Sequence, residues 1–309
     1  MGKFILKRVL MLLPVVVGIT LFIYVIMSVA PGDPARLILG SDATHEEVLA
    51  KRTELGLDRP VLVRYGSYML GVFRGDFGTS WYNNFNVISE FLARLPNTLT
   101  LGLLAMGLAA VLGIPLGILA AVRQYHVVDY TTLAGAMIFS SMPAFWFGLM
   151  AQVYISLRLG WLPATGAGSL AHFVLPAVTL AAAQLASQVR MTRTSMLEVI
   201  KQDYVRTARS KGATERRVIV RHVLRNGMLP VITQLGIAFA MLLGGTIVTE
   251  SVFAIPGVAS LLINAVRLRD VPVVMGIIVI IATFVGVVNL LVDLLYAVID
   301  PRIKLGYEA

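Results

Sequence analysis

The sequence predicts an all-α membrane protein with six transmembrane helices. Of its 309 residues, 57% are hydrophobic and only 14% are charged, whereas charged residues make up about a quarter of a typical soluble domain. Several apolar stretches are long enough to cross a bilayer, which takes about 20 helical residues. There is no cysteine, so disulfides, thiolate metal sites and cysteine nucleophiles are excluded.

The formal net charge of +9 does not indicate binding to nucleic acid, because no nucleic-acid-binding motif accompanies it. In a membrane protein, Lys and Arg mark the cytoplasmic side. The segments predicted inside hold 16 Lys and Arg, and the short loops predicted outside hold three. This bias predicts that both termini are cytoplasmic. The four histidines lack any metal-binding spacing, so no metal site is predicted.

Residues 1–30 form a cytoplasmic N-terminus followed by the first predicted span, at about 9–30. A cleaved signal peptide is the alternative, but its apolar core usually has about 7–15 residues. Here the core is longer and runs into the turn Pro31-Gly32-Asp33-Pro34. We therefore expect an uncleaved span.

Residues 31–96 are the one long hydrophilic region and are predicted to be extracytoplasmic. Glu46–Leu57 has the pattern of a short amphipathic helix that ends near Gly56. Val61–Phe73 has the pattern of another, with Val61, Tyr65, Tyr68, Met69 and Val72 on one face. A loop follows at Gly75-Asp76-Phe77-Gly78.

The remaining spans are predicted at about residues 97–122, 130–157, 172–189, 228–250 and 271–299, before a cytoplasmic tail at 301–309. The third is expected to break near Pro143. In the second, Gly113 and Gly117 have GxxxG spacing, which permits close helix approach. Small residues are common in any membrane helix, so the spacing alone does not show whether another helix packs closely there.

No catalytic constellation is present. The chain lacks GxxxxGK[ST] and GxSxG, so neither ATP binding through a P-loop nor a serine hydrolase site is predicted. Asp293 is the one carboxylate well inside a predicted span, and it shares a helical face with Asn289 and Tyr296. An inter-helix anchor is the interpretation we favour over a substrate or proton site.

A translocation pathway through these spans has to be lined by neutral polar side chains. Candidates are Gln184, Ser187, Gln188 and Gln234, although ordinary inter-helix hydrogen bonds explain such residues equally well.

The most basic part of the chain is Gln202–Pro230, which we call the basic segment. We expect a helix over Glu198–Lys211, a stop at Gly212, a second helix from Thr214 to Asn226-Gly227, and Pro230 at the start of the fifth span. Such a helix–Gly–helix unit suits docking into a groove of a soluble partner. An amphipathic helix resting on anionic headgroups is an equal alternative on physical grounds.

The basic segment also resembles a known family. Arg206-Thr207-Ala208 with Gly212 and Leu229-Pro230 is similar to the "EAA…G…LP" signature of ABC importer permeases, in the form of the dipeptide/oligopeptide branch. Further similar pieces follow in order along nearly the whole chain: Pro31–Pro34, Gly75–Gly78, Asp203-Tyr204, Arg221–Asn226, Glu250 with Pro256-Gly257, Arg269-Asp270 and Asn289–Arg302.

The resemblance implies a type I ABC importer permease fold, with residues 97–300 as the permease core and residues 31–96 as a periplasmic helical region. It implies a B-type subunit in a bacterial inner membrane, working with a homologous second permease, two ABC ATPases and an extracytoplasmic solute-binding protein. It makes residues 198–227 the coupling region, with these ATPase contacts: Tyr204, Arg206, Thr207, Ala208, Lys211, Gly212 and Ala213. ATP and Mg are expected on the ATPases, and no cofactor on this chain.

The implied function is import of di- or oligopeptides or glutathione by alternating access. Permeases of this type also import nickel chelates or opines, and selectivity is expected to lie largely in the binding protein. The short loop at residues 158–171 is as typical of glutathione- and oligopeptide-type permeases as of dipeptide ones. A stand-alone secondary transporter is the alternative from another class, and the scarcity of charge in the spans disfavours it.

Overall fold

The computed structural model describes residues 2–299, and the side chains of residues 10–241 and 243–291. Within this range the chain is helical and has no strand, only one isolated bridge between Thr79 and Asn86. Five helices are long and apolar enough to cross a membrane, and a bent helix pair makes a sixth when its two halves are counted as one span. The predicted all-α class with six spans is confirmed.

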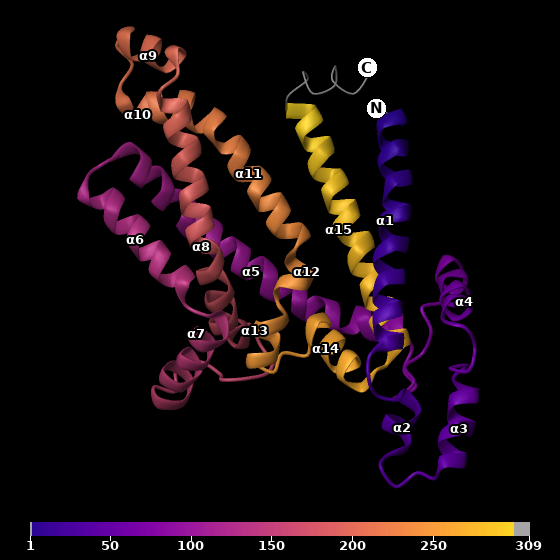
Figure 1. Cartoon of the computed structure of the whole chain (residues 1–309). Helices are drawn as coiled ribbons and strands as arrows, with labels where there is room; N and C mark the ends of the chain where they lie inside the picture. Colours follow the sequence, from indigo (N-terminus) through magenta and orange to yellow (C-terminus); the bar gives the residue numbers. More distant parts are fainter. Residues whose placement is uncertain (1, 300–309) are drawn as a thin grey trace. The chain divides into compact units, whose positions relative to one another are not determined.

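The chain divides into two compact units, one formed by the residues up to Thr98 together with those from Pro256 onward, the other by Leu99–Ile255. In the first unit, α1 (Gly2–Val29) packs side by side with α15 (Val271–Ile299) (Figure 1). The same unit contains α2 (Pro34–Leu39), α3 (His45–Glu54), α4 (Val61–Phe73), the start of α5 (Val87–Val122) and α14 (Val258–Leu268).

The predicted apolar face of α4 is confirmed. Tyr65 and Met69 are buried in a cluster with Tyr24 of α1 and Met275 of α15. The hydroxyl of Tyr65 donates to the carbonyl of Val17 at 2.9 Å. The other predicted amphipathic helix, Glu46–Leu57, is α3, which spans His45–Glu54 and so ends before Gly56.

Sequence pieces that lie far apart meet in this unit. The guanidinium of Arg269 donates to the carbonyl of Ala30 at 2.9 Å and also to that of Pro31. Gly32 has φ +116°, a backbone conformation that favours glycine, and a Cβ there would lie 2.9 Å from Arg269 Nε. Asp270 accepts hydrogen bonds from Ser80 Oγ and, at 3.1 Å, from the backbone N–H of Trp81.

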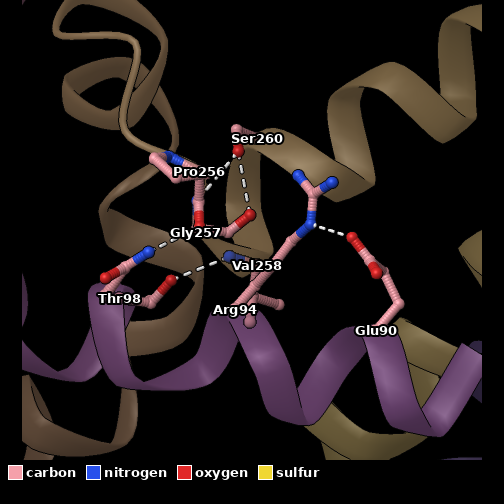
Figure 2. A network of polar contacts seen from close by, with 8 residues as sticks. Glu90, Arg94, Thr98, Pro256, Gly257, Val258 and Ser260 are labelled. Carbon is pink, nitrogen blue, oxygen red and sulfur yellow. Dashed lines mark hydrogen bonds and ion pairs between the residues drawn. The ribbon is translucent and has the colours of Figure 1, made fainter. Parts of the chain in front are cut away.

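Polar contacts also hold the start of α14 to α5. Figure 2 shows Thr98 Oγ1 accepting the backbone N–H of Val258 at 2.8 Å. Asn97 Nδ2 donates to the carbonyl of Pro256 at 2.9 Å, and Ser260 Oγ accepts the N–H of Gly257 at 3.1 Å. These bonds satisfy backbone groups in the turn that precedes α14.

The second unit is built around α8 (Ala171–Ile200), which packs against α6 (Val127–Ser141), α7 (Ala144–Ala151) and α11 (Leu224–Ala240) (Figure 1). Its other elements are π-helix η1 (Gln152–Arg158), α9 (Asp203–Ser210), α10 (Glu215–Arg217), π-helix η2 (Val218–Val223), α12 (Leu242–Gly245) and α13 (Ile247–Val252).

The two glycines of the GxxxG spacing face α8. A Cβ on Gly113 would lie 2.8 Å from Gln188 Cβ, and one on Gly117 would lie 2.6 Å from Thr192 Cβ and 2.8 Å from the carbonyl oxygen of Val189. The spacing therefore serves close helix approach within this chain.

The third span breaks at Pro143, as expected, with a 91° bend between its halves. Several other helix boundaries differ from those expected. Helix α5 already begins at Val87, so its first ten residues precede the predicted span at Asn97. The fifth span was expected over 228–250, but α11 ends at Ala240 and is followed by the short helices α12 and α13. Gly244 and Gly245 lie in this broken stretch, where they weaken a continuous helix.

Pro230 does not open the fifth span, as expected, but lies inside α11. The helix continues through it from Glu215 to Ala240. The predicted tail at 301–309 falls outside the described residues.

Candidate docking site on the basic segment

The basic segment starts with a break. The expected helix over Glu198–Lys211 is wrong, because α8 ends at Ile200 and Gln202 is extended, with ψ 148°. The carbonyl of Gln202 accepts the N–H of Val205 at 3.0 Å, so a new helix, α9, starts in a new direction (Figure 1).

One face of α9 is buried. Val205 is fully buried in a cluster with Ala121, Met196, Val218 and Val223, which we call the base cluster. Ala208 and Ala213 are partly buried against the same cluster. The opposite face, with Arg206 and Thr207, is exposed. Helix α9 therefore rests on the ends of α5, α8 and η2 and presents its polar side outward.

Gly212 ends α9 in a left-handed conformation with φ +80°. The N–H of Gly212 donates to the carbonyl of Arg209 at 2.9 Å, and the N–H of Ala213 donates to that of Ala208 at 3.3 Å. This pair of bonds, with the apolar contact of Ala208 and Ala213 on one cluster, is a Schellman cap. A Cβ on Gly212 would meet nothing within 4 Å, so the backbone angle, not space, favours glycine here.

The chain then turns into α10. Thr214 is extended at the N-cap, and its carbonyl accepts the N–H of Val218 at 2.9 Å. Arg209 Nε donates to Glu215 Oε1 at 2.7 Å across the turn. Both side chains are well exposed, so this ion pair adds little stability.

Helices α8 and α11 are joined directly beneath this unit. Ser195 Oγ donates to the carbonyl of Gly227 at 2.6 Å, and a Cβ on Gly227 would lie 3.1 Å from Met196 Sδ. Tyr204 Oη accepts a hydrogen bond from Asn226 Nδ2 at 2.7 Å. These contacts attach α9 of the basic segment to both long helices, α8 and α11.

A buried ion pair extends this connection to α6. Arg193 of α8 binds Asp129 bidentately, with Nε–Oδ1 2.6 Å and Nη2–Oδ2 2.7 Å. The carboxylate also accepts the N–H of Tyr125 at 3.0 Å and is 1% exposed. This ion pair was not predicted from the sequence. Nothing in one sequence connects residues 64 positions apart.

The exposed surface of the basic segment carries a strong positive charge. All of its basic residues are exposed: Arg206, Arg209, Lys211, Arg216, Arg217, Arg221 and Arg225. Only Asp203 and Glu215 oppose them. The predicted contacts Tyr204, Arg206, Thr207, Lys211 and Gly212 lie on this exposed surface.

The four candidate pathway residues all lie in the second unit. Gln184 and Ser187 of α8 and Gln234 of α11 are partly buried, whereas Gln188 is 4% exposed and packs on Gly113. Gln188 is thus a helix-packing residue as well as a polar one. Asn289 is exposed, but the side chains of Asp293 and Tyr296 lie outside the described residues, so the anchor formed by these three stays a prediction.

Glu250, which the sequence marked only as part of the family resemblance, is a buried acid. Glu250 is fully buried in α13 and accepts a hydrogen bond from Thr246 Oγ1 at 2.9 Å. Among the described residues, no group of three or more His, Asp or Glu side chains is placed to hold a metal ion.

Two family models together match nearly the whole chain. The model described as "Binding-protein-dependent transport system inner membrane component" matches residues 113–305. Its N-terminal companion, "Binding-prot-dependent transport system membrane comp, N-term", matches residues 1–102.

Curated relatives are similar over full length. The dipeptide transport system permease protein DppB of Escherichia coli (strain K12) is 41% identical over 339 residues, covering 98% of this chain and 99% of the relative. The oligopeptide transport system permease protein AppB of Bacillus subtilis (strain 168) is 42% identical over 318 residues, with 98% and 100% covered. The glutathione transport system permease protein GsiC of Salmonella typhi is 40% identical over 304 residues, with 98% and 99% covered.

Solved structures show the same fold at low sequence identity. A chain of the inward-facing MetNI methionine ABC transporter (native CY5 crystal form) has a TM-score of 0.52 and 19% identity, covering 67% of this chain and 96% of that chain. A chain of an amino acid ABC transporter crystallised with histidines has a TM-score of 0.52 and 20% identity, covering 70% and 94%.

Proposed function

Because the chain belongs to the family of binding-protein-dependent transport system inner membrane components, we propose that it forms half of the pathway of an ATP-driven peptide importer. Its basic segment docks on a cytoplasmic ATPase. A homologous permease supplies the other half of the pathway, two ATPases hydrolyse ATP with Mg, and an extracytoplasmic binding protein delivers the substrate. Both termini then lie in the cytoplasm.

The observation that carries the coupling proposal is the construction of α9. Its inner face is buried in the base cluster, while the exposed residues on its other side are polar or basic. An element that only marked topology needs positive charge near a span end and no packed shape. An exposed helix on a rigid base suits entry into a groove of a soluble protein.

The same contacts allow the basic segment to transmit motion to the membrane helices. A displacement of α9 reaches α8 and α11 through the base cluster and the Ser195–Gly227 hydrogen bond. The Arg193–Asp129 pair carries it to α6, and the Gly113 and Gly117 contacts carry it to α5. Because packed interfaces shift as rigid bodies more easily than they deform, closure of the ATPases moves these helices together and opens the pathway.

The substrate class is proposed from the relatives, which are named for dipeptide, oligopeptide and glutathione transport. The alignment with the dipeptide relative runs over 339 residues, more than the 309 of this chain, whereas that with the glutathione relative runs over 304. The alignment with the oligopeptide relative, over 318 residues, also exceeds the length of this chain, so all three peptide substrates stay within the proposed class.

The test is an exchange on the outer face of α9 in the assembled complex. Arg206→Glu with Thr207→Tyr leaves the buried face intact and reverses the charge that meets the partner. Since each 1.4 kcal/mol changes an equilibrium tenfold, loss of such a contact weakens ATPase binding at least about tenfold. Peptide uptake into proteoliposomes and peptide-stimulated ATP hydrolysis fall together.

The matched control is Arg158→Glu, the same charge change at an exposed arginine of η1. It leaves ATPase binding and uptake unchanged. Equal effects of the two exchanges, or peptide uptake by the chain without any ATPase, would contradict the coupling proposal. Normal coupling with uptake of a nickel chelate or an opine in place of peptides would contradict only the substrate class.

A further inference from the structure

Helix α4 has two apolar faces, and only one of them is accounted for by packing. The inner face, with Tyr65 and Met69, is buried against α1 and α15. On the other side lie Leu62, Val63, Leu70 and Phe73, each more than half exposed. We call these four residues the open face. A helix exposed to water on one side carries polar residues there.

The position of α4 along α1 explains this pattern. The apolar part of α1, Leu10–Val29, has 20 residues and at 1.5 Å per residue spans about 30 Å, the thickness of a hydrocarbon core. Tyr65 of α4 is hydrogen-bonded to Val17 and Thr20, which lie about 14–18 Å along the helix from Val29. The side chain of Tyr65 therefore reaches close to the middle of the span.

Helix α15 gives a second, shallower measure of the depth, because the same cluster begins at Val271, the first residue of α15. Met275 and Val279 belong to the cluster that holds Tyr65 and Met69. They lie four and eight residues into α15, which begins at Val271, so about 6–12 Å from its end. Helix α4 thus lies beside α1 (Figure 1), and its buried residues also pack on α15, at a depth that the lengths along both helices place in the hydrocarbon.

The positions of the charged residues near α4 also agree with a helix that lies in hydrocarbon. Arg59 and Arg74 flank the helix beside Asp58 and Asp76, and all four side chains are exposed, so the charges lie at the ends of α4, where they can reach the polar headgroup region. The one charge within the helix, Arg64, points to the inner side, with its guanidinium carbon 5.8 Å from the centre of the Tyr24 ring. With 13 residues, α4 is too short to cross the bilayer.

From this placement we propose that α4 is embedded in the lipid leaflet around the Val29 end of α1, with its open face against acyl chains. The region between the first two spans is then not wholly aqueous: α4 is a membrane-buried support, and the hairpin of α2 and α3 is the part free to meet water. The occupant of the open face is lipid, because α4 packs on α1 within its apolar stretch, where large apolar side chains such as Phe22, 65% exposed, are also uncovered. This inference does not depend on the proposed transport function.

The absence of cysteine from the whole chain allows a direct test by single nitroxide labels. Leu70→Cys and Phe73→Cys label the open face, Phe22→Cys on α1 serves as the lipid reference, and Leu49→Cys on α3 is the matched aqueous control, a half-exposed leucine of the same region. The full chain, with the subunits that co-purify, is placed in nanodiscs of phosphatidylethanolamine and phosphatidylglycerol. Collision of each label with oxygen and with a water-soluble nickel complex is then measured by electron paramagnetic resonance.

Labels at Leu70 and Phe73 are expected to collide often with oxygen and rarely with nickel, as at Phe22, while Leu49 shows the reverse. High nickel collision at both open-face positions would place α4 in water and overturn the proposal. Low collision with both reagents would show that a protein subunit covers the open face, which also overturns it.

Discussion

Replacing Arg193 by Met tests whether the Asp129–Arg193 pair is a structural joint between α6 and α8. The exchange removes two charge-assisted hydrogen bonds, worth about 1.5–3 kcal/mol each, from a carboxylate that is 1% exposed. Only the bond from the N–H of Tyr125 remains to it. Breaking a buried pair by removing one partner costs about 3–5 kcal/mol. Because the side chain of Arg193 is 19% exposed and water can partly replace it, we expect about 3 kcal/mol.

For a unit of this size, 1 kcal/mol shifts the melting temperature by about 2–4 °C, so Arg193→Met should lower it by about 6–12 °C. Thermal unfolding of the purified chain, followed by circular dichroism in detergent, measures this. Arg190→Met is the matched control, because Arg190 is exposed on the same helix and surface exchanges usually stay within about 0.5 kcal/mol.

The two partners should respond unequally. Asp129→Asn leaves a guanidinium that reaches water, so it should cost less than Arg193→Met, which leaves a buried carboxylate. The double variant Asp129→Asn with Arg193→Met should be more stable than Arg193→Met alone. If Arg190→Met and Arg193→Met destabilise equally, or if the double variant is the sum of the single ones, the reasoning from burial is refuted.

Two further predictions concern glycines. Gly117→Ala should cost about 1–3 kcal/mol, because its Cβ would lie 2.6 Å from Thr192 Cβ. Gly107→Ala on the same helix meets nothing within 4 Å, so in the same melting assay it should not destabilise the chain and should raise its stability by up to about 1 kcal/mol. Equal melting temperatures of the two variants would contradict the close approach of α5 and α8. At Gly212 φ is +80°, a left-handed conformation that Asn tolerates and a β-branched residue does not. Gly212→Asn should therefore retain most peptide-stimulated ATP hydrolysis, and Gly212→Val should lose it. If Gly212→Ala retains more activity than Gly212→Asn, side-chain size decides the ranking, and fit to the partner rather than the helix cap selects glycine.

The sequence by itself was enough to predict the membrane class, the number of spans and the amphipathic helix Val61–Phe73. These follow from composition and from short-range periodicity, which depend on neighbours a few residues apart. The family resemblance likewise rested on local motifs such as Arg206-Thr207-Ala208 and Gly212. The break at Pro143 was predictable for the same reason, since proline acts on its own turn of helix.

Tertiary packing decided what the local patterns left open. The equal alternatives for Gly113 and Gly117 were resolved by Gln188 and Thr192, which lie about 75 residues further along the chain. The helix expected across Lys201-Gln202 is broken because Val205 turns into the base cluster, and that cluster collects residues from four separate elements. Asp129 connects α6 to α8 only because the fold places Arg193 next to it. The depth proposed for α4 follows only from its contacts with Val17 and Thr20. The physical reason is common to all of these: periodicity states which face of a helix is apolar, but the neighbour that covers that face, and its depth in the bilayer, are set by residues far away in the sequence.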